Sequence, residues 1–305
     1  MLRIRSVLGN SQRLDGGAMF GNLPRAVWSR WCPPDEAGRI ALACRALLVE
    51  DGTRKILLET GIGAFFEPKL RERFGVVERE HCLITRLAEL GVPHTEIDAV
   101  VLSHLHFDHA GGLLAAYEPG KAPALLFPRA QFIVGRTALD RAKSPHPRDR
   151  ASFIPELVGL LEASGRLEII EQEAAHVGPV LAAAQQPPAS ASLGERFSFV
   201  LSSGHTPGML HTLVRGEAAE VFFCADLVPG LPWVHLPITM GYDRYPELLI
   251  DEKTQLFAGL LERRSWLCFT HDPACALARL SLENGRYSAV EQLSDAELDL
   301  DLDAA

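Results

Sequence analysis

The segment 99–112 constrains this chain more than any other stretch. It starts with four apolar residues that predict a buried strand, and it continues as Ser-His-Leu-His-Phe-Asp-His before Ala-Gly-Gly. His104 and His106 are two residues apart, so at a strand end their side chains point to the same side of the sheet, and Asp108 and His109 fall on the turn beyond. A single histidine on an apolar strand is usually a hydrogen-bonded core residue. Three histidines and a carboxylate within six residues instead predict a metal site.

The rest of the chain predicts an α/β protein, because both halves have the order strands then helix, which is compatible with two sheets stacked between helices. Alternating apolar residues predict a hairpin over 40–49 and 54–59 around Asp51-Gly52, and a second hairpin is expected at Asn284-Gly285. Helical spacing is found within 65–90 and over 154–163 and 245–264. We expect one domain over 1–305, with the acidic tail 294–305 flexible.

Composition excludes several classes of function. The net charge is −9, and no basic stretch favours a nucleic acid or an anionic membrane surface as a partner. No apolar run reaches the roughly 20 residues that span a bilayer. The six cysteines have no Cys-X-X-Cys spacing, which favours reduced, buried thiols and a cytoplasmic protein.

The segment 99–112 resembles the signature of the metallo-β-lactamase-fold hydrolases. Three downstream segments extend the resemblance: Ser-Ser-Gly-His-Thr-Pro-Gly at 202–208, Phe-Phe-Cys-Ala-Asp at 222–226 and Cys-Phe-Thr-His-Asp-Pro at 268–273. The resemblance implies that one ion is held by His104, His106 and His205, and a second ion by Asp108, His109 and His271. It also implies that Asp226 bridges them, and that the α/β fold is an αββα sandwich, with two mixed β-sheets flanked by helices.

A seven-ligand set of this kind implies a dinuclear hydrolase. Two ions about 3.5–4 Å apart hold a bridging water and lower its pKa toward about 7, so the expected nucleophile is a metal-bridging hydroxide. Zn²⁺ is the expected metal, although such ligands also bind Mn, Fe and Co. Asp108 is either a simple ligand or also the group that carries a proton to the leaving alkoxide. Glu59 stands where relatives usually have Asp, in a position beneath the metals.

Each of three further features has two interpretations. His211 either supports the metal site from behind or is a core-edge histidine of a strand. Cys224 either approaches the metal side of its strand or fills the core. The apolar segment 14–36 either covers an edge of the domain or forms a wall of the substrate pocket.

Two segments resemble the quorum-quenching N-acyl-homoserine lactone lactonase group, namely 14–21 (Leu-Asp-Gly-Gly-Ala-Met-Phe-Gly) and 231–243. The resemblance implies ring opening of N-acyl-homoserine lactones or similar lactones, with a small apolar ester or lactone as substrate and a possible homodimer. The chain departs from this group at Pro229, where the best-known lactonases have a catalytic Tyr. His235 or Tyr242 is the expected replacement as oxyanion donor, unless both simply pack on the helix 245–264. The alternatives are a phosphotriesterase or aryl-ester hydrolase of the same fold, and a non-catalytic metal-binding sensor.

Overall fold

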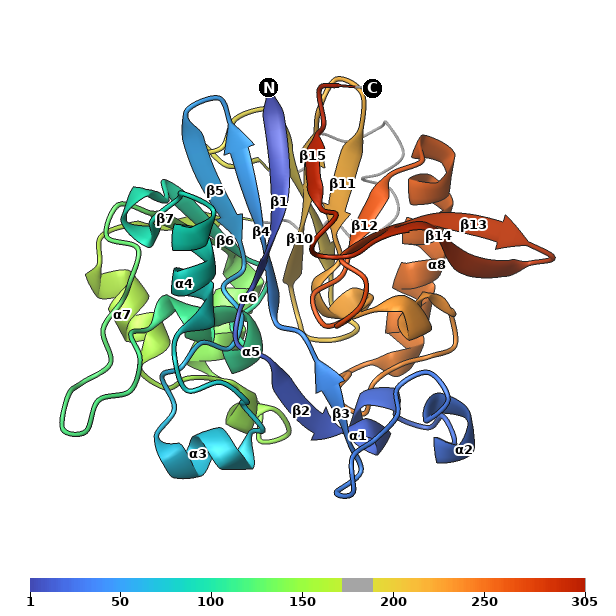
Figure 1. The fold of residues 1–305 in the computed structure, drawn as a ribbon, viewed down its shortest axis with the longest axis horizontal. Helices are drawn as coiled ribbons and strands as arrows, with labels where there is room; N and C mark the ends of the chain where they lie inside the picture. Colours follow the sequence, from blue (N-terminus) through green and yellow to red (C-terminus); the bar gives the residue numbers. More distant parts are fainter. Residues whose placement is uncertain (172–188, 305) are drawn as a thin grey trace.

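The computed structural model describes residues 1–171 and 189–304. Within these residues the strands form two large sheets that lie side by side, with helices on their outer faces (Figure 1). The first sheet has the strand order β15 (Asp299–Asp301), β1 (Leu2–Leu8), β4 (Arg45–Asp51), β5 (Arg54–Leu58), β6 (Ala99–Leu102), β7 (Gln131–Gly135) and β8 (Leu167–Ile170). The second has the order β14 (Arg286–Leu293), β13 (Leu277–Glu283), β12 (Trp266–Cys268), β11 (Glu220–Phe223), β10 (Met209–Arg215) and β9 (Phe197–Ser202).

Both sheets are mixed. In the first sheet β1, β4 and β5 pair antiparallel, whereas β5 to β8 pair parallel. In the second sheet one parallel pair, β11 with β12, joins antiparallel neighbours. Parallel neighbours need crossover connections, and the segments between these strands supply them. The expected αββα arrangement is therefore what the structure has.

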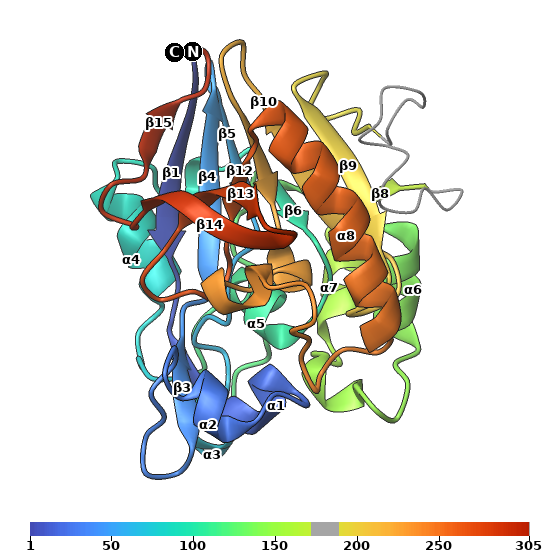
Figure 2. The ribbon, with the colours of Figure 1, turned by 90° about the vertical axis from the view of Figure 1, so that its right-hand side faces the viewer.

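The helices divide between the two outer faces. On the first sheet lie α4 (Cys82–Glu89), α5 (Phe107–Ala110), α6 (Arg136–Lys143) and α7 (Leu157–Ala163), while α8 (Pro246–Arg263) covers the second sheet (Figures 1 and 2). A smaller group lies at one end of the molecule: α1 (Gly16–Phe20), α2 (Arg25–Trp28), α3 (Pro68–Arg73) and the ribbon of β2 (Gln12–Asp15) with β3 (Arg39–Leu42).

Strand β4 shows why the first sheet is buried on both faces. Its residues alternate between two apolar cores: Leu47 and Val49 pack in the core that includes the second sheet, and Ala46 and Leu48 pack in the core under α4 and α7. A strand covered on both faces needs a continuous apolar run rather than an alternating one, which Ala46–Val49 supplies. The expected strand over 40–49 is divided in the structure, because the chain leaves the ribbon at Leu42 and enters the sheet at Arg45.

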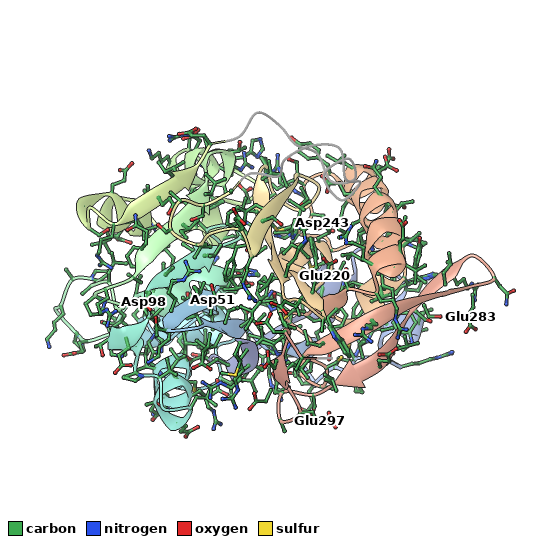
Figure 3. All side chains as sticks on the ribbon, turned by 90° about the horizontal axis from the view of Figure 1, so that it is seen from above. Asp51, Asp98, Glu220, Asp243, Glu283 and Glu297 are labelled. Atoms are coloured by element: carbon green, nitrogen blue, oxygen red, sulfur yellow. The ribbon has the colours of Figure 1, made fainter. Side chains whose placement is uncertain are left out.

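The acidic tail is packed against the body of the protein, so the prediction of a flexible tail is wrong for residues 294–304. Strand β15 pairs antiparallel with β1, and Leu298 and Leu302 are buried. Three aspartates of the tail pair with arginines of the body: Asp295 with Arg45, Asp299 with Arg3 and Asp303 with Arg196. The alternation of Leu and Asp is thus the period-2 pattern of an edge strand. Glu297 lies at the edge of the molecule (Figure 3).

None of the helices in the described residues combines the length and the apolar composition that crossing a membrane requires.

Candidate metal centre

The predicted ligands come from strand ends of both sheets. His104 and His106 follow β6, and Asp108 and His109 lie in α5, the short helix that comes next. From the second sheet, His205 lies in the loop between β9 and β10, Asp226 in a single 3₁₀ turn after β11, and His271 after β12. Loop residues at strand ends are free of sheet pairing, so they can turn toward a common point. The structure brings all seven residues together between the two sheets.

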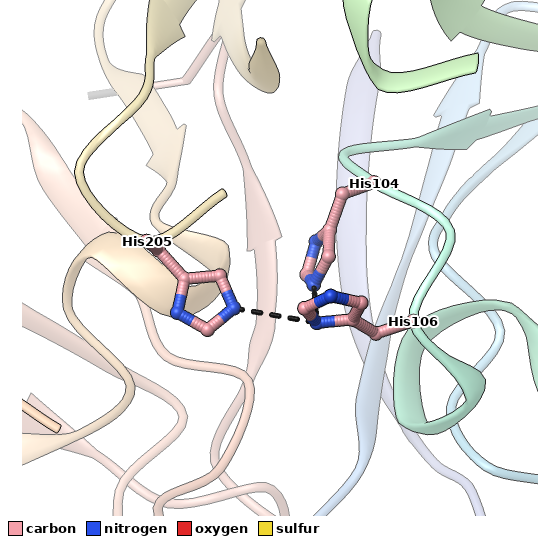
Figure 4. Close-up of side chains that lie close together, drawn as sticks. All are labelled: His104, His106 and His205. Atoms are coloured by element: carbon pink, nitrogen blue, oxygen red, sulfur yellow. Dashed lines mark hydrogen bonds between the residues drawn. The ribbon is translucent and has the colours of Figure 1, made fainter. Parts of the chain in front are cut away.

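Three histidines form the first group. The Nε2 atom of His104 lies 3.0 Å from Nδ1 of His106, and Nε2 of His205 lies 3.4 Å from the same Nδ1 (Figure 4). Burial lowers the pKa of His104 and His106 well below the usual value, which keeps both rings neutral. Neutral imidazole nitrogens with free lone pairs are the form in which histidine binds a metal.

Asp108, His109 and His271 form the second group. Nε2 of His109 and Nε2 of His271 lie 3.3 Å apart. The Oδ2 atom of Asp108 is 3.8 Å from the first of these nitrogens and 3.7 Å from the second. All three ligand atoms therefore lie around one small volume, as they do in the first group.

Asp226 lies between the two groups. Its Oδ2 atom is 3.2 Å from Nε2 of His205, and its Oδ1 atom is 3.0 Å from Nε2 of His271 and 3.3 Å from Nε2 of His109. Burial raises the pKa of Asp226, but the histidines around it have the larger combined effect and hold it well below its usual range. An ionised carboxylate with one oxygen toward each group is the arrangement of a bridging ligand.

These residues fit a pair of divalent ions. The Oδ1 atom of Asp226 is buried and accepts no hydrogen bond, although two imidazole nitrogens lie close to it. Leaving a buried carboxylate oxygen without a partner costs free energy, and a cation removes that cost. The set of histidine nitrogens and carboxylate oxygens is typical of zinc and of similar first-row ions.

A second layer of groups fixes the histidine rings. Glu59 is buried at a positive φ of 60°, where it accepts a hydrogen bond of 2.8 Å from Nδ1 of His109. Glu59 also accepts a hydrogen bond from the hydroxyl of Ser103, whose oxygen lies 2.9 Å from Nδ1 of His104. One carboxylate therefore orients a ligand in each group, the role expected for a residue beneath the metals.

Two partners in this layer were not found from the sequence. Asp243 accepts a hydrogen bond of 2.8 Å from Nδ1 of His205, and the backbone carbonyl of Ala43 accepts one of 2.7 Å from Nδ1 of His271. Asp243 is 38 residues from His205 along the chain, and a backbone carbonyl has no sequence signal at all. Each of these bonds places a proton on Nδ1, so that in the neutral ring Nε2, the atom facing the other ligands, keeps its lone pair.

A cavity of about 320 Å³ opens onto the cluster. Tyr242 lines it, and burial raises the pKa of this phenol to about 12, with the negative charge of Asp108 adding to the effect. Arg148, which the sequence analysis did not single out, also lines the cavity and donates a hydrogen bond of 2.7 Å to the carbonyl of Gly241. The apolar part of the lining consists of Leu14, Met19, Leu42, Phe74, Phe107, Ala151 and Met240.

The segment 14–36 takes both of the roles left open for it. Leu14 and Met19 are part of the cavity wall. Trp28 is buried instead, and its ring stacks on Phe20, which stacks in turn on Trp233 with ring centroids 4.6 Å apart. The aromatic stack closes the edge of the core behind the cavity.

The structure does not bring His235 to the metal cluster, so its expected role as oxyanion donor is corrected. The 3₁₀ turn Leu231–Val234 carries it into a separate groove that Trp31, Leu231 and Tyr287 also line. His211 is a core histidine: it bonds the hydroxyl of Ser202, and burial lowers its pKa to about 4. Cys224 is likewise buried in the core and belongs to neither ligand group.

The fold and the paired ligand groups define a class, the metal-dependent hydrolases that hold their ions between two stacked sheets. Residues 39–263 match the family model described as the metallo-beta-lactamase superfamily, and the chain belongs to that family.

Solved structures share the fold over almost the whole chain. A probable metal-dependent hydrolase from Staphylococcus aureus is 24% identical with a TM-score of 0.78, covering 96% of this chain and 98% of that one. AidC, a dizinc quorum-quenching lactonase solved with a product N-acyl-L-homoserine, is 20% identical with a TM-score of 0.70, covering 95% and 94%. At these identities the likeness concerns the fold alone.

The chain is also similar, over part of its length, to a ribonuclease. Ribonuclease TTHA0252 of Thermus thermophilus is 28% identical over 183 residues, which are 60% of this chain. They are 34% of the ribonuclease, so the match spans about a third of that protein.

Proposed function

We propose that this protein is a dinuclear metal-dependent hydrolase that opens the ring of N-acyl-homoserine lactones or similar lactones. The observation that carries the proposal is the position of Asp226 between two ligand groups at the base of a largely apolar cavity. The structural likeness to the lactonase AidC supports the choice of substrate class.

The chemistry needs two divalent ions, which we propose to be Zn²⁺, with Mn, Fe or Co as alternatives. His104, His106 and His205 would hold one ion, Asp108, His109 and His271 the other, and Asp226 both. Bound there, such ions polarise an ester carbonyl and lower the pKa of water to about 7, which provides hydroxide at neutral pH.

Asp108 and Tyr242 are proposed to complete the reaction. Opening the ring breaks the bond between the carbonyl carbon and the ring oxygen, and the departing alkoxide must take up a proton. Asp108 lines the cavity, where its carboxylate can take up the proton that the water loses on becoming hydroxide and pass it to that alkoxide. Because the pKa of Tyr242 is about 12, its hydroxyl keeps its proton at neutral pH and can donate a hydrogen bond to the oxyanion.

The rest of the cavity is proposed to bind the acyl amide. The side chains of Leu14, Met19 and Met240 offer an apolar surface to an acyl chain. The guanidinium of Arg148 can donate a hydrogen bond to the amide carbonyl.

The same lining argues against RNA as the main substrate. Arg148 lies in the cavity with the carboxylates of Asp108, Asp149 and Asp226, and the whole chain has a net charge of −9. A polyanionic substrate needs a positive surface along its backbone. The phosphotriesterase or aryl-ester hydrolase remains the alternative, because the same nucleophile attacks phosphorus or an activated ester.

The test is a matched pair of measurements on one purified sample: metal content per chain, and proton release from a short-chain and a long-chain N-acyl-homoserine lactone. We expect about two ions per chain and turnover that depends on chain length. Two ions without lactone turnover would refute the lactonase, and paraoxon, an aryl acetate and a short RNA would then be assayed. A metal-loaded protein inert toward all of them would favour the sensor.

A further inference from the structure

The loop that carries His271 is held from behind by a buried arginine. The side chain of Arg45, at the start of β4, is fully buried. It donates a hydrogen bond of 2.5 Å to the carbonyl of Phe269 and one of 2.8 Å to the carbonyl of Asp272. These carbonyls lie two residues before and one residue after His271, so a single guanidinium is hydrogen-bonded to the loop on both sides of this histidine.

The backbone of residues 43–45 also forms hydrogen bonds with this loop. The amide of Ala43 donates to the carbonyl of His271 at 3.1 Å, and the amide of Arg45 donates to the carbonyl of Thr270 at 3.0 Å. The carbonyl of Ala43 accepts the bond from Nδ1 of His271. Residues 43–45, which lead into β4 of the first sheet, therefore hold this ligand together with Pro229, whose carbonyl accepts a hydrogen bond of 2.9 Å from the amide of His271.

The tail supplies the charge that keeps Arg45 in place. Asp295 comes shortly after β14 and pairs with Arg45 in a two-pronged contact, with 2.5 Å from Nε to Oδ1 and 2.7 Å from Nη2 to Oδ2. It also accepts a hydrogen bond from the hydroxyl of Ser6. A planar guanidinium that bonds a carboxylate on one edge and two carbonyls on others has its orientation fixed.

From this arrangement we propose that Asp295 is a positioning residue for one of the two metal sites. It acts through Arg45 on His271, and so on the group Asp108, His109 and His271. Within the described residues, the side chain of Asp295 contacts Arg45 and Ser6 and makes no direct contact with His104, His106 or His205. The acidic tail is thus part of the metal site's support. This inference depends on the proposed dinuclear centre but not on its substrate.

The first test is the variant Asp295→Asn, compared with Asp299→Asn. Asp299 lies on the same tail and pairs with Arg3, but that pair is exposed and remote from the cluster. Metal-stripped proteins are titrated with Zn²⁺ against a competing chelator. We expect Asp295→Asn to weaken the binding of one ion by about 10-fold and to leave the other ion within about threefold of wild type. This is the lower end of the range for groups bonded directly to metal ligands, because Asp295 acts through Arg45. Asp299→Asn should bind both ions as wild type does.

A second measurement needs neither metal nor activity. Amide hydrogen exchange in the metal-free proteins should be faster at 269–272 in Asp295→Asn than in wild type, and unchanged there in Asp299→Asn. Asp295→Glu, which keeps the charge, should lie between Asp295→Asn and wild type. If Asp295→Asn does not fold, Ser6→Ala removes one contact of the carboxylate and should shift the same ion in the same direction.

Three results would overturn the proposal: equal weakening of both ions, unchanged exchange at 269–272, or an effect of Asp299→Asn as large as that of Asp295→Asn. Selective weakening of one ion in Asp295→Asn with no lactone turnover in wild type would refute the substrate but keep the positioning role.

Discussion

Glu59 offers a demanding test of the metal centre, because one carboxylate orients a ligand in each group. Its side chain is 1% exposed, and it accepts hydrogen bonds from His109 Nδ1 and from the hydroxyl of Ser103. Replacement by glutamine keeps the size of the side chain but leaves one acceptor oxygen and adds an N–H donor.

The replacement by glutamine changes which histidine nitrogens carry protons. If the amide oxygen of the introduced glutamine accepts from His109, its N–H group faces Ser103, whose hydroxyl hydrogen must then turn toward Nδ1 of His104. That favours the tautomer of His104 with a proton on Nε2, the atom that faces His106. If the amide is turned the other way, the N–H group faces His109 and disturbs the second group in the same manner.

We therefore expect Glu59→Gln to weaken the affinity for at least one ion by about 10–100-fold, or about 1.4–2.7 kcal/mol. The matched control is Glu59→Asp, which keeps both acceptor oxygens and tolerates the positive φ of 60° at this position. Chelator-competition titration with Zn²⁺ measures both affinities. Wild-type binding of both ions in Glu59→Gln, or equal damage in Glu59→Asp, would refute this account of the hydrogen bonds.

Three further predictions concern other residues. Asp226→Ala should bind no more than one ion per chain and lose nearly all hydrolysis, and retention of two ions would contradict the bridging role. Tyr242→Phe should lower kcat for lactones with little change in metal content. His235→Ala, in the separate groove, should keep wild-type kcat and KM. The reverse result would restore His235 as the oxyanion donor. Burial raises the pKa of Glu252 from 4.5 to about 7, so between these values the folded protein binds a proton that the unfolded chain has released. The stability from this proton is complete below pH 4.5 and is lost as the pH rises through 7. Glu252→Gln should therefore flatten the fall in the free energy of unfolding measured by urea at pH 5 and pH 7.5, and an unchanged slope would show that another group titrates.

Much of the fold followed from local patterns. The hairpin at Asn284-Gly285 and the helix α8 were expected from turn residues and apolar spacing, and both are present. The candidate ligands His104, His106, Asp108 and His109 could be assigned together because they lie within six residues directly after one predicted strand. Periodicity and turn chemistry report on contacts within a few residues, and for these features such contacts are decisive.

The partners that hold those ligands were decided by the tertiary structure. Asp243 reaches His205 across 38 residues, and Asp295 reaches Arg45 across 250. The tail 294–304 was expected to be flexible because its charges suggest solvent, yet arginines of distant strands pair with it. His235 was assigned a role by proximity in sequence, and a 3₁₀ turn placed it elsewhere.

The sequence by itself thus indicated the candidate metal ligands of the segment 99–112, whose signal is local spacing, and predicted the type of layered fold through its resemblance to a known family. How the second sheet stacks on the first, which groups orient each histidine, and what the tail contacts depend on packing between segments far apart in the chain. Contacts of this kind contribute to the free energy of folding only after the two sheets have packed together.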